Sequence, residues 1–440
     1  IAMGDYDNDG VDDLFVVVSP QAPGLVGMPY GVVCDVEDKS TCYSQAGTVV
    51  VFKVKQRKAK DKDGEYTSAK YTAREESHLL FNNNPLEMAG TGSARIVLMD
   101  FNGDGKLDIM VNDNGLWIDG QLPGKNDVYF LSNEGEGWTE SSATHVTGTN
   151  VQRGKGLKTF SHSLTAGDID GDGDIDAVVT SVKWVGRNQS QNGEIFCYVN
   201  QGDGHMVVRK CGDQFGFEVE LGDIDNDGDL DLVFGSVAYS GGKFWDTLNQ
   251  IPGCYSKTKC NGAFNGILLN DGDGNFFERG FSFPDEVLLS TGIPHHGVPN
   301  ISVADLDGDG DLDVVRSHVG YNYAGGGMTI EENLGNGTFK TVLYSEHCAG
   351  PKTKADLQVM EGGSQNCWNS EFKFGDFNED GFVDIYIDGT AADKVEWLRD
   401  GAIFMSTGKF TYDVVQTRDE NYPLIKLEIK KSLTKLKTVY

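Results

Sequence analysis

The segment GDIDGDGDIDAVV at residues 167–179 decides the fold of this chain. Its central nine residues fit the pattern D-x-D/N-x-D-G-x-x-D, which occurs six times in the 440 residues. The copies begin at Asp5, Asp100, Asp168, Asp223, Asp305 and Asp376, so successive starts are 95, 68, 55, 82 and 71 residues apart. A motif that returns at variable spacing predicts a repeated structural unit with surface insertions of different length.

Each copy offers oxygen ligands for a hard divalent cation. Positions 1, 3, 5 and 9 are always Asp or Asn, a spacing that lets one tight turn wrap an ion of the size of Ca²⁺. The side chains at position 7 differ widely, so the backbone carbonyl is the ligand predicted there. An Asp-rich turn without an ion is the alternative, because Asp and Gly also favour turns. We predict about six Ca²⁺ ions, and the predicted ligands are Asp5, Asp7, Asp9, Val11 and Asp13; Asp100, Asn102, Asp104, Lys106 and Asp108; Asp168, Asp170, Asp172, Asp174 and Asp176; Asp223, Asp225, Asp227, Asp229 and Asp231; Asp305, Asp307, Asp309, Asp311 and Asp313; and Asp376, Asn378, Asp380, Phe382 and Asp384.

The remaining positions of the motif argue against an EF-hand. An EF-hand needs a bidentate Glu at position 12, and none of the six copies has Glu there. Position 6 is always Gly, which permits a sharp bend. Position 2 is always apolar, so we predict that its side chain points into the core: Tyr6, Phe101, Ile169, Ile224, Leu306 and Phe377.

The flanks of each motif predict β-strands. Short apolar or alternating runs rich in β-branched residues, such as ISVAD and LDVVRS around the fifth copy, are typical of strands. A second pair of strands around a Gly-rich turn follows in most units, as in GILLNDGDGNFFER at 266–279. Four antiparallel strands per unit form one blade of a β-propeller. We therefore predict an all-β propeller with six recognisable blades, or seven if part of the chain supplies another.

These loops resemble FG-GAP or VCBS-type repeats, as found in integrin α-subunit propellers and in fungal and bacterial propeller lectins. The motifs GDIDGDGDIDAVV at 167–179 and GDIDNDGDLDLVFG at 222–235 carry the resemblance. It implies a Ca²⁺ loop between the first and second strands of each blade, on the lower face. The sequence departs from the family in showing six loops where seven blades are common, and in Asn102 and Asn378, which weaken two sites. We expect residues 1–415 to form the propeller and residues 416–440 to be a closing strand, part of a further blade, or a linker.

The charge of the chain comes largely from these motifs. Of its 67 acidic residues 27 lie in the six copies, and without them the net charge of −30 becomes −3. The net charge of −30 argues against a nucleic-acid binder, whose binding surface is basic. No apolar run is long enough to span a membrane. Because Ile1 reads as the middle of a strand, we expect the chain to be a processed or excerpted piece.

The eight cysteines indicate an oxidising compartment. They fall into near neighbours along the chain, which predicts four local disulfides: Cys34 with Cys42, Cys197 with Cys211, Cys254 with Cys260, and Cys348 with Cys367. Buried free thiols are the alternative for some of them. Three glycosylation sequons also fit secretion and begin at Asn188, Asn300 and Asn336. We expect an extracellular or secretory-lumen location.

Aromatic residues follow the second predicted strand in most units. A propeller brings equivalent positions together on one rim, where aromatic rings with polar neighbours could stack on sugars. The alternative is that they cap the central channel and pack against neighbouring loops. The candidate ligand-binding residues are Trp117, Trp184, Trp245, Tyr321, Tyr323 and Trp397.

The sequence predicts a binding protein more readily than an enzyme. Catalytic motifs such as G-x-S-x-G, H-E-x-x-H and the P-loop are not present. The leading hypothesis is an extracellular adhesion or scaffold module for a protein or glycan partner, either alone or as part of a larger assembly. A propeller lectin is the second hypothesis. A polysaccharide lyase is the third, with candidate bases His162, His295 and Tyr323 beside a Ca²⁺ ion.

Overall fold

In the computed structural model, the described residues form β-strands in successive antiparallel sheets, with one short helical turn. It describes residues 2–18, 32–34, 42–44, 48–60, 66–80, 95–112, 129–133, 138–149, 151–152, 156–157, 161–181, 194–212, 217–235, 254–256, 259–260, 265–277, 283, 297–319, 326–335, 338–348, 372–378, 380–387, 401–416 and 428–429. The chain divides into two compact units, which are residues 1–161, 200–208 and 420–440 in unit 1 and residues 162–199 and 209–419 in unit 2.

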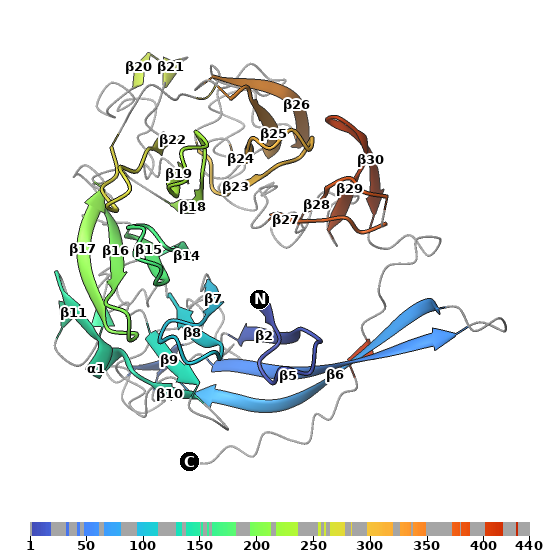
Figure 1. Cartoon of the computed structure of the whole chain (residues 1–440). Coiled ribbons are helices and arrows are strands. Elements are labelled where there is room, and N and C mark those ends of the chain that lie inside the picture. Colours follow the sequence, from blue (N-terminus) through green and yellow to red (C-terminus); the bar gives the residue numbers. More distant parts are fainter. Residues whose placement is uncertain are drawn as a thin grey trace. The chain divides into compact units, whose positions relative to one another are not determined.

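Two sheets of unit 1 each begin with an acidic motif between their first two strands (Figure 1). The first sheet has the order β1-β2-β5-β6-β31, made of β1 (Ala2–Gly4), β2 (Asp13–Val18), β5 (Thr48–Lys60), β6 (Tyr66–Leu80) and β31 (Glu428–Ile429). The second has the order β7-β8-β9-β10, made of β7 (Ile96–Met99), β8 (Asp108–Val111), β9 (Tyr129–Asn133) and β10 (Trp138–Glu140). The short β31 pairs in parallel with β6, so part of the C-terminal segment adds an outer strand to the first sheet.

Short elements complete the first part of the chain. They are β3 (Val32–Cys34) with β4 (Cys42–Ser44), the single helical turn α1 (Ser142–His145), β11 (Val146–Gly148), and β12 (Val151–Gln152) with β13 (Gly156–Leu157). Strand β11 pairs in parallel with β17.

Four further sheets follow in sequence order. The third sheet contains β14 (Leu164–Gly167), β15 (Asp176–Ser181), β16 (Glu194–Asn200) and β17 (Met206–Gly212). The fourth contains β18 (Glu218–Gly222), β19 (Asp231–Gly235) and β22 (Asn265–Leu268), and the hairpin β20 (Cys254–Ser256) and β21 (Lys259–Cys260) precedes β22. The fifth contains β23 (Ile301–Ala304), β24 (Asp313–Val319), β25 (Gly326–Asn333) and β26 (Phe339–Cys348). The sixth contains β27 (Phe372–Gly375), β28 (Asp384–Ile387), β29 (Ala402–Gly408) and β30 (Thr411–Gln416).

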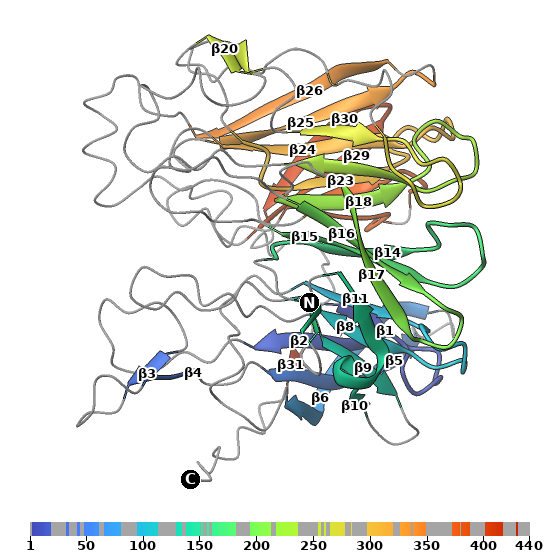
Figure 2. The same ribbon diagram turned by 90° about the vertical axis from the view of Figure 1, so that its left-hand side faces the viewer.

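The first strands of successive sheets lie next to one another. In unit 2, β14 contacts β18, β18 contacts β23, and β23 contacts β27. In unit 1, β1 contacts β7. Contacts between the first strands of successive four-stranded sheets are typical of propeller blades. Figure 2 shows the sheets of unit 2 edge-on, with the turns that join their first two strands at the same end.

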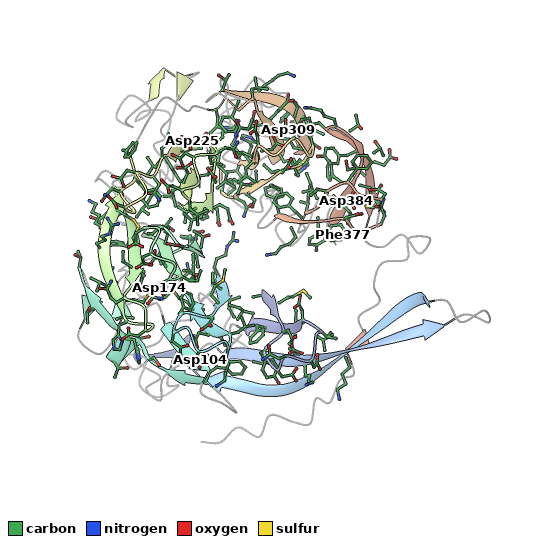
Figure 3. The ribbon with its side chains drawn as sticks, viewed as in Figure 1. Asp104, Asp174, Asp225, Asp309, Phe377 and Asp384 are labelled. Carbon is green, nitrogen blue, oxygen red and sulfur yellow. A yellow bond between two sulfur atoms is a disulfide. The ribbon has the colours of Figure 1, made fainter. Side chains whose placement is uncertain are left out.

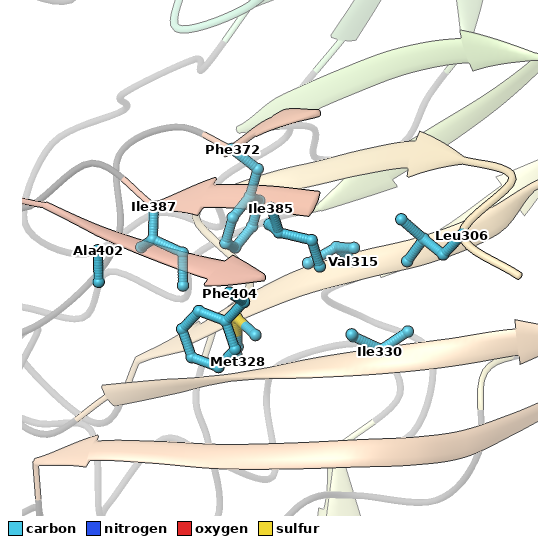
Figure 4. Close-up of a cluster of buried hydrophobic side chains, with 9 residues drawn as sticks. All are labelled: Leu306, Val315, Met328, Ile330, Phe372, Ile385, Ile387, Ala402 and Phe404. Atoms are coloured by element: carbon cyan, nitrogen blue, oxygen red, sulfur yellow. The ribbon is translucent and has the colours of Figure 1, made fainter. Parts of the chain in front are cut away.

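The core lies between successive sheets. In the cluster of Figure 4, Leu306 and Val315 of the fifth sheet pack with Phe372, Ile385 and Phe404 of the sixth. Ile169 packs in the same way against the fourth sheet and Ile224 against the fifth. The strands are apolar on both faces because each sheet is covered on two sides, which is why β19 is buried at every residue.

Position 2 of the motif is buried in four copies, as predicted: Phe101, Ile169, Ile224 and Leu306 are at most 2% exposed. The prediction is wrong for Phe377, whose side chain is 45% exposed (Figure 3). Tyr6 is half-buried. The next sheet covers Ile169, Ile224 and Leu306. Phe377 belongs to the last sheet of unit 2, and no later sheet follows among the residues described in that unit.

One disulfide is present in the described residues: Cys197 of β16 is bonded to Cys211 of β17. The backbone register also places Cys34 opposite Cys42 and Cys254 opposite Cys260. The pairing of Cys348 with Cys367 stays a prediction, because Cys367 lies outside the described residues.

In the part of the chain that the structure describes, no helix is long and apolar enough to cross a membrane.

Candidate metal centres

Each acidic motif forms the turn between the first and second strands of a sheet. We name these turns loop 1 (5–13), loop 2 (100–108), loop 3 (168–176), loop 4 (223–231), loop 5 (305–313) and loop 6 (376–384). Figure 3 labels one acidic residue in each of loops 2 to 6: Asp104, Asp174, Asp225, Asp309 and Asp384. Strands flank every loop, which is the context that the sequence predicted.

The aspartate at position 1 organises the turn through backbone hydrogen bonds. In loop 4, the N–H groups of Asp227 and Gly228 donate to the two carboxylate oxygens of Asp223, both at 3.1 Å. The aspartate at position 5 then accepts from the N–H of position 7, as Asp227 does from Asp229 at 3.1 Å. The glycine at position 6 has φ between 81° and 99° in all six loops, a conformation that side chains other than glycine rarely adopt.

The aspartate at position 9 is the buried anchor of the loop. It is at most 1% exposed in loops 1 to 6. In loop 4, Asp231 accepts from the N–H of Ile224 at 2.9 Å and from the N–H of Asn270 at 2.8 Å. Burial raises the pKa of Asp231 to about 6 and that of Asp313 to about 7. The backbone hydrogen bonds lower both pKa values, but their effect is smaller than that of burial. An adjacent positive charge would remove this penalty on the ionised form.

Three carboxylates converge in four of the loops. Oxygens of positions 1, 3 and 9 lie within 4.8 Å of one another in loops 1, 3, 4 and 5. Two ligands of one Ca²⁺ ion can be about 5 Å apart at most, because each Ca–O distance is about 2.3–2.6 Å. These oxygens can therefore bind the same ion.

The carboxylates at position 3 supply the test of whether a cation fits. One oxygen of Asp170 and one of Asp225 are buried, and each lacks a hydrogen-bond partner among the described residues. Burial, followed by repulsion from the neighbouring aspartates, raises the pKa of each of these carboxyls. A buried carboxylate oxygen without a partner is costly, so the donor set of loops 3 and 4 fits a divalent cation with oxygen ligands.

Loops 2 and 6 replace the carboxylate at position 3 with an amide. Asn102 accepts from the N–H of Asp104 at 3.0 Å, and Asn378 accepts from the N–H of Asp380 at 3.1 Å. The turn therefore keeps its hydrogen bonds while it has one negative charge fewer at this position.

Lysine side chains reach the acidic groups of loops 1 and 5. Lys53 of β5 forms ion pairs with Asp7 and, at 3.3 Å, with Asp9. Lys409, in the turn between β29 and β30, lies 2.5 Å from the buried carboxylate of Asp307 and 2.9 Å from Glu332. These two ion pairs raise the pKa of Lys409 above its usual value. Loops 1 and 5 thus have an ammonium group beside position 3, whereas Asp170 and Asp225 have an unpartnered oxygen.

This difference predicts a specific effect of Lys409→Met. Without the ammonium group, Asp307 is left without a positive partner when chelator is present, so thermal unfolding in chelator should occur at a lower temperature than in the wild type. In millimolar calcium the difference should shrink, because the ion neutralises the same carboxylate. Differential scanning fluorimetry in the two buffers measures both values. Lys340→Met is the matched control, since Lys340 contacts Glu332 at 3.3 Å and is not paired with loop 5; equal responses of the two variants would contradict the assignment.

The raised pKa values predict how the stability of the metal-free protein depends on pH. The folded-state pKa values of Asp231 and Asp313, about 6 and about 7, lie above the unfolded value of about 3.9. Their contribution to stability is therefore fully present below about pH 4 and is lost as the pH rises through 6 to 7. In chelator, the unfolding temperature should be higher at pH 5 than at pH 8, and Asp231→Asn with Asp313→Asn should flatten this difference. An equally steep profile in the double variant would contradict the role of these two groups.

The other predicted site residues are placed as follows. The six candidate rim residues (Trp117, Trp184, Trp245, Tyr321, Tyr323 and Trp397) lie outside the described residues, as do His295, Asn188 and Asn336. His162 stacks on Phe217, with ring centroids 3.9 Å apart, and burial lowers its pKa to about 3. Asn300 is fully buried, and glycosylation at this residue stays a prediction.

Sequence reasoning missed three asparagines that contact the loops. Asn200, Asn270 and Asn333 are buried and donate hydrogen bonds to loop carbonyls. Their signal in the sequence is N-x-G-x-G at the end of the third strand, in NQGDG, NDGDG and NLGNG.

The comparison with protein families agrees with this geometry. Residues 100–179, which contain loops 2 and 3, match the family model of the FG-GAP-like repeat. The match, the acidic turns and the sheet topology agree with one another: residues 100–179 match FG-GAP-like repeats and lie in a series of propeller-like antiparallel sheets.

Two similar solved structures share little sequence with this chain. No curated protein matches the chain significantly. A Tc holotoxin pore of Photorhabdus luminescens is similar over 85% of this chain, at 16% sequence identity and a TM-score of 0.32, and the chain spans 14% of that toxin chain. A lectin of Aleuria aurantia, solved with α-methyl-L-fucoside, is similar over 92% of this chain and 94% of the lectin, at 9% identity and a TM-score of 0.37. At these TM-scores, neither likeness bears on the ligand of this chain.

Proposed function

We propose that this chain is an extracellular, calcium-stabilised binding module rather than an enzyme. The observation that carries the proposal is the convergence of three carboxylates in each of four loops, with buried, unpartnered oxygens of Asp170 and Asp225 among them. Such a group repels itself until a cation neutralises it. Calcium would be held by the side chains at positions 1, 3, 5 and 9 and by the carbonyl at position 7, and its charge would offset the repulsion between these carboxylates.

Native mass spectrometry across a calcium titration tests the proposal. We expect loops 3 and 4 to fill first, because the carboxylate at position 3 lacks a lysine partner there, and loops 2 and 6 to fill last, because Asn replaces that carboxylate. Asp225→Asn should lower the number of strongly bound ions by one. A chain that binds no calcium at millimolar concentration would contradict the proposal.

We propose that the binding partner is an extracellular protein or glycan, and that the propeller presents loops as a rigid scaffold for it. The extracellular location is supported by the disulfide between Cys197 and Cys211. We further propose that each of the six loop-bearing sheets is one blade and that residues 1–415 form the propeller.

The aromatic rim predicted from the sequence gives the lectin hypothesis its test. On a glycan array in calcium buffer, Trp184→Ala and Trp397→Ala should each weaken binding about tenfold or more, since stacking on an aromatic face contributes on the order of 1–2 kcal/mol. Trp138→Phe serves as a control outside the rim: Trp138 packs against Tyr6 and Phe15. Glycan binding that both rim variants retain in full would remove the rim as the binding surface.

A further inference from the structure

Three buried asparagines occupy the same place in consecutive sheets. In each sheet, the residue after position 9 pairs with a residue of the third strand: Ala177 with Tyr198, Leu232 with Leu268, and Val314 with Glu331. Each asparagine lies two residues after that third-strand partner. The asparagines are Asn200, Asn270 and Asn333, with exposed fractions of 1%, 4% and 1%. Buried amides of this kind need hydrogen-bond partners.

Each amide group reaches the loop of the preceding sheet. The Nδ2 atoms of Asn200, Asn270 and Asn333 donate to the carbonyl oxygens of position 2 in loops 2, 3 and 4, at 2.7, 2.7 and 2.9 Å. These carbonyls belong to Phe101, Ile169 and Ile224. The contact therefore joins two successive repeats at the residue directly after the first acidic ligand.

The same asparagines also bind the loop of their own sheet. The backbone N–H of Asn270 donates to Asp231 at 2.8 Å, and that of Asn333 donates to Asp313 at 2.9 Å. Their Nδ2 atoms also donate to the carbonyls of Leu230 at 3.0 Å and of Leu312 at 3.3 Å, both at position 8. One residue thus holds two loops.

These contacts form one continuous series through unit 2. Within loops 3, 4 and 5, the N–H of position 2 donates to the aspartate at position 9, at 3.0, 2.9 and 3.0 Å. Asn270 then joins loop 3 to loop 4, and Asn333 joins loop 4 to loop 5. Every aspartate in the series is a candidate ligand, so the order of one loop is linked physically to the order of the next.

We propose that Asn270 and Asn333 couple loops 3, 4 and 5, so that a cation bound in one loop raises the affinity of its neighbour. The inference rests on the proposed calcium binding. An ion in loop 3 fixes the turn that carries the Ile169 carbonyl, and only a fixed carbonyl satisfies the buried amide of Asn270. Asn270 in turn positions Asp231 in loop 4. If loop 3 is open, one N–H of this buried amide loses its acceptor, so closed neighbouring loops favour each other.

The chain itself suggests the variant for the test. Ser406 occupies the equivalent place in the sixth sheet, where its N–H donates to Asp384 at 2.7 Å and its hydroxyl donates to Gly408 within the same sheet. Asn270→Ser should therefore keep the backbone contact to Asp231 and lose the contact to loop 3. Ser406→Ala is the matched control, because it alters the same position without removing a contact to another loop.

Calcium titrations of the full chain, followed by isothermal calorimetry with native mass spectrometry, measure the coupling. For Asn270→Ser, we expect the same number of bound ions, a less steep binding curve, and an affinity about fivefold weaker for the coupled loops. Ser406→Ala should match the wild type. An unchanged curve for Asn270→Ser would overturn the coupling while leaving the proposed function intact; a wild-type chain that binds no calcium would overturn both.

A second measurement does not depend on the folding of Asn270→Ser. Hydrogen exchange of the Asp168→Asn chain, in which loop 3 has lost a ligand, should show weaker calcium-induced protection in loop 4 as well as in loop 3, while loop 6 responds as in the wild type. Loss of protection confined to loop 3 would overturn the coupling.

Discussion

In excess chelator, the protein should unfold at a temperature on the order of 10 °C below its unfolding temperature in millimolar calcium. An ion that binds only the folded state contributes about 2.7 kcal/mol when its concentration is 100 times its dissociation constant. Several loops would contribute to this difference. In loops 4 and 5, removal of the ion would leave the buried carboxylates of Asp231 and Asp313 without a neutralising charge.

Calorimetry with and without chelator measures this difference. Calcium added back after chelation should restore the higher unfolding temperature. Magnesium at equal concentration should restore less of it, because the smaller ion requires near-octahedral geometry and retains its water. An unfolding temperature that chelator does not change would contradict a structural role of the loops.

Asp231→Ala should be among the most destabilising single substitutions in the chain, at about 3 kcal/mol or more. The carboxylate is fully buried and accepts hydrogen bonds from the N–H groups of Ile224 and Asn270. Its removal leaves two buried donors without their acceptor and takes away a candidate ligand. Chemical denaturation in calcium gives the change in the free energy of unfolding.

Asp229→Ala is the matched control for this variant. Asp229 lies at position 7 of the same loop, where the backbone carbonyl is the proposed ligand. Desolvation and then repulsion from neighbouring aspartates raise the pKa of its carboxyl. Its loss should change stability in calcium by about 0.5 kcal/mol or less. Equal losses for the two variants would show that position 9 has no special role.

The repeated chemistry of the loops was the part that the sequence could predict. Six copies place Asp or Asn at positions 1, 3, 5 and 9 and Gly at position 6, so one turn geometry had to suit them all. The structure adds a left-handed position 4, where Asn8 and Asn226 have φ of 57° and 60°. Asn or Gly at that position in five copies is a signal that could have been used.

Contacts between repeats could not be predicted from one motif. Lys409 meets Asp307 only because the turn of the sixth sheet lies over loop 5, and nothing in their spacing indicates it. The bridge from Asn270 to Ile169 spans 101 residues. Phe377 is a further example. Its apolar side chain predicts burial, but it is exposed because burial at this position depends on a neighbouring sheet.

The most direct test of the central claim is a crystal structure grown in millimolar calcium, with anomalous differences recorded for calcium. We expect peaks in loops 3 and 4 that lie about 2.3–2.6 Å from the side-chain oxygens of positions 1, 3 and 9. Loops 3 and 4 without anomalous peaks, at full calcium concentration and with Asp170 and Asp225 well ordered, would contradict calcium binding in these loops.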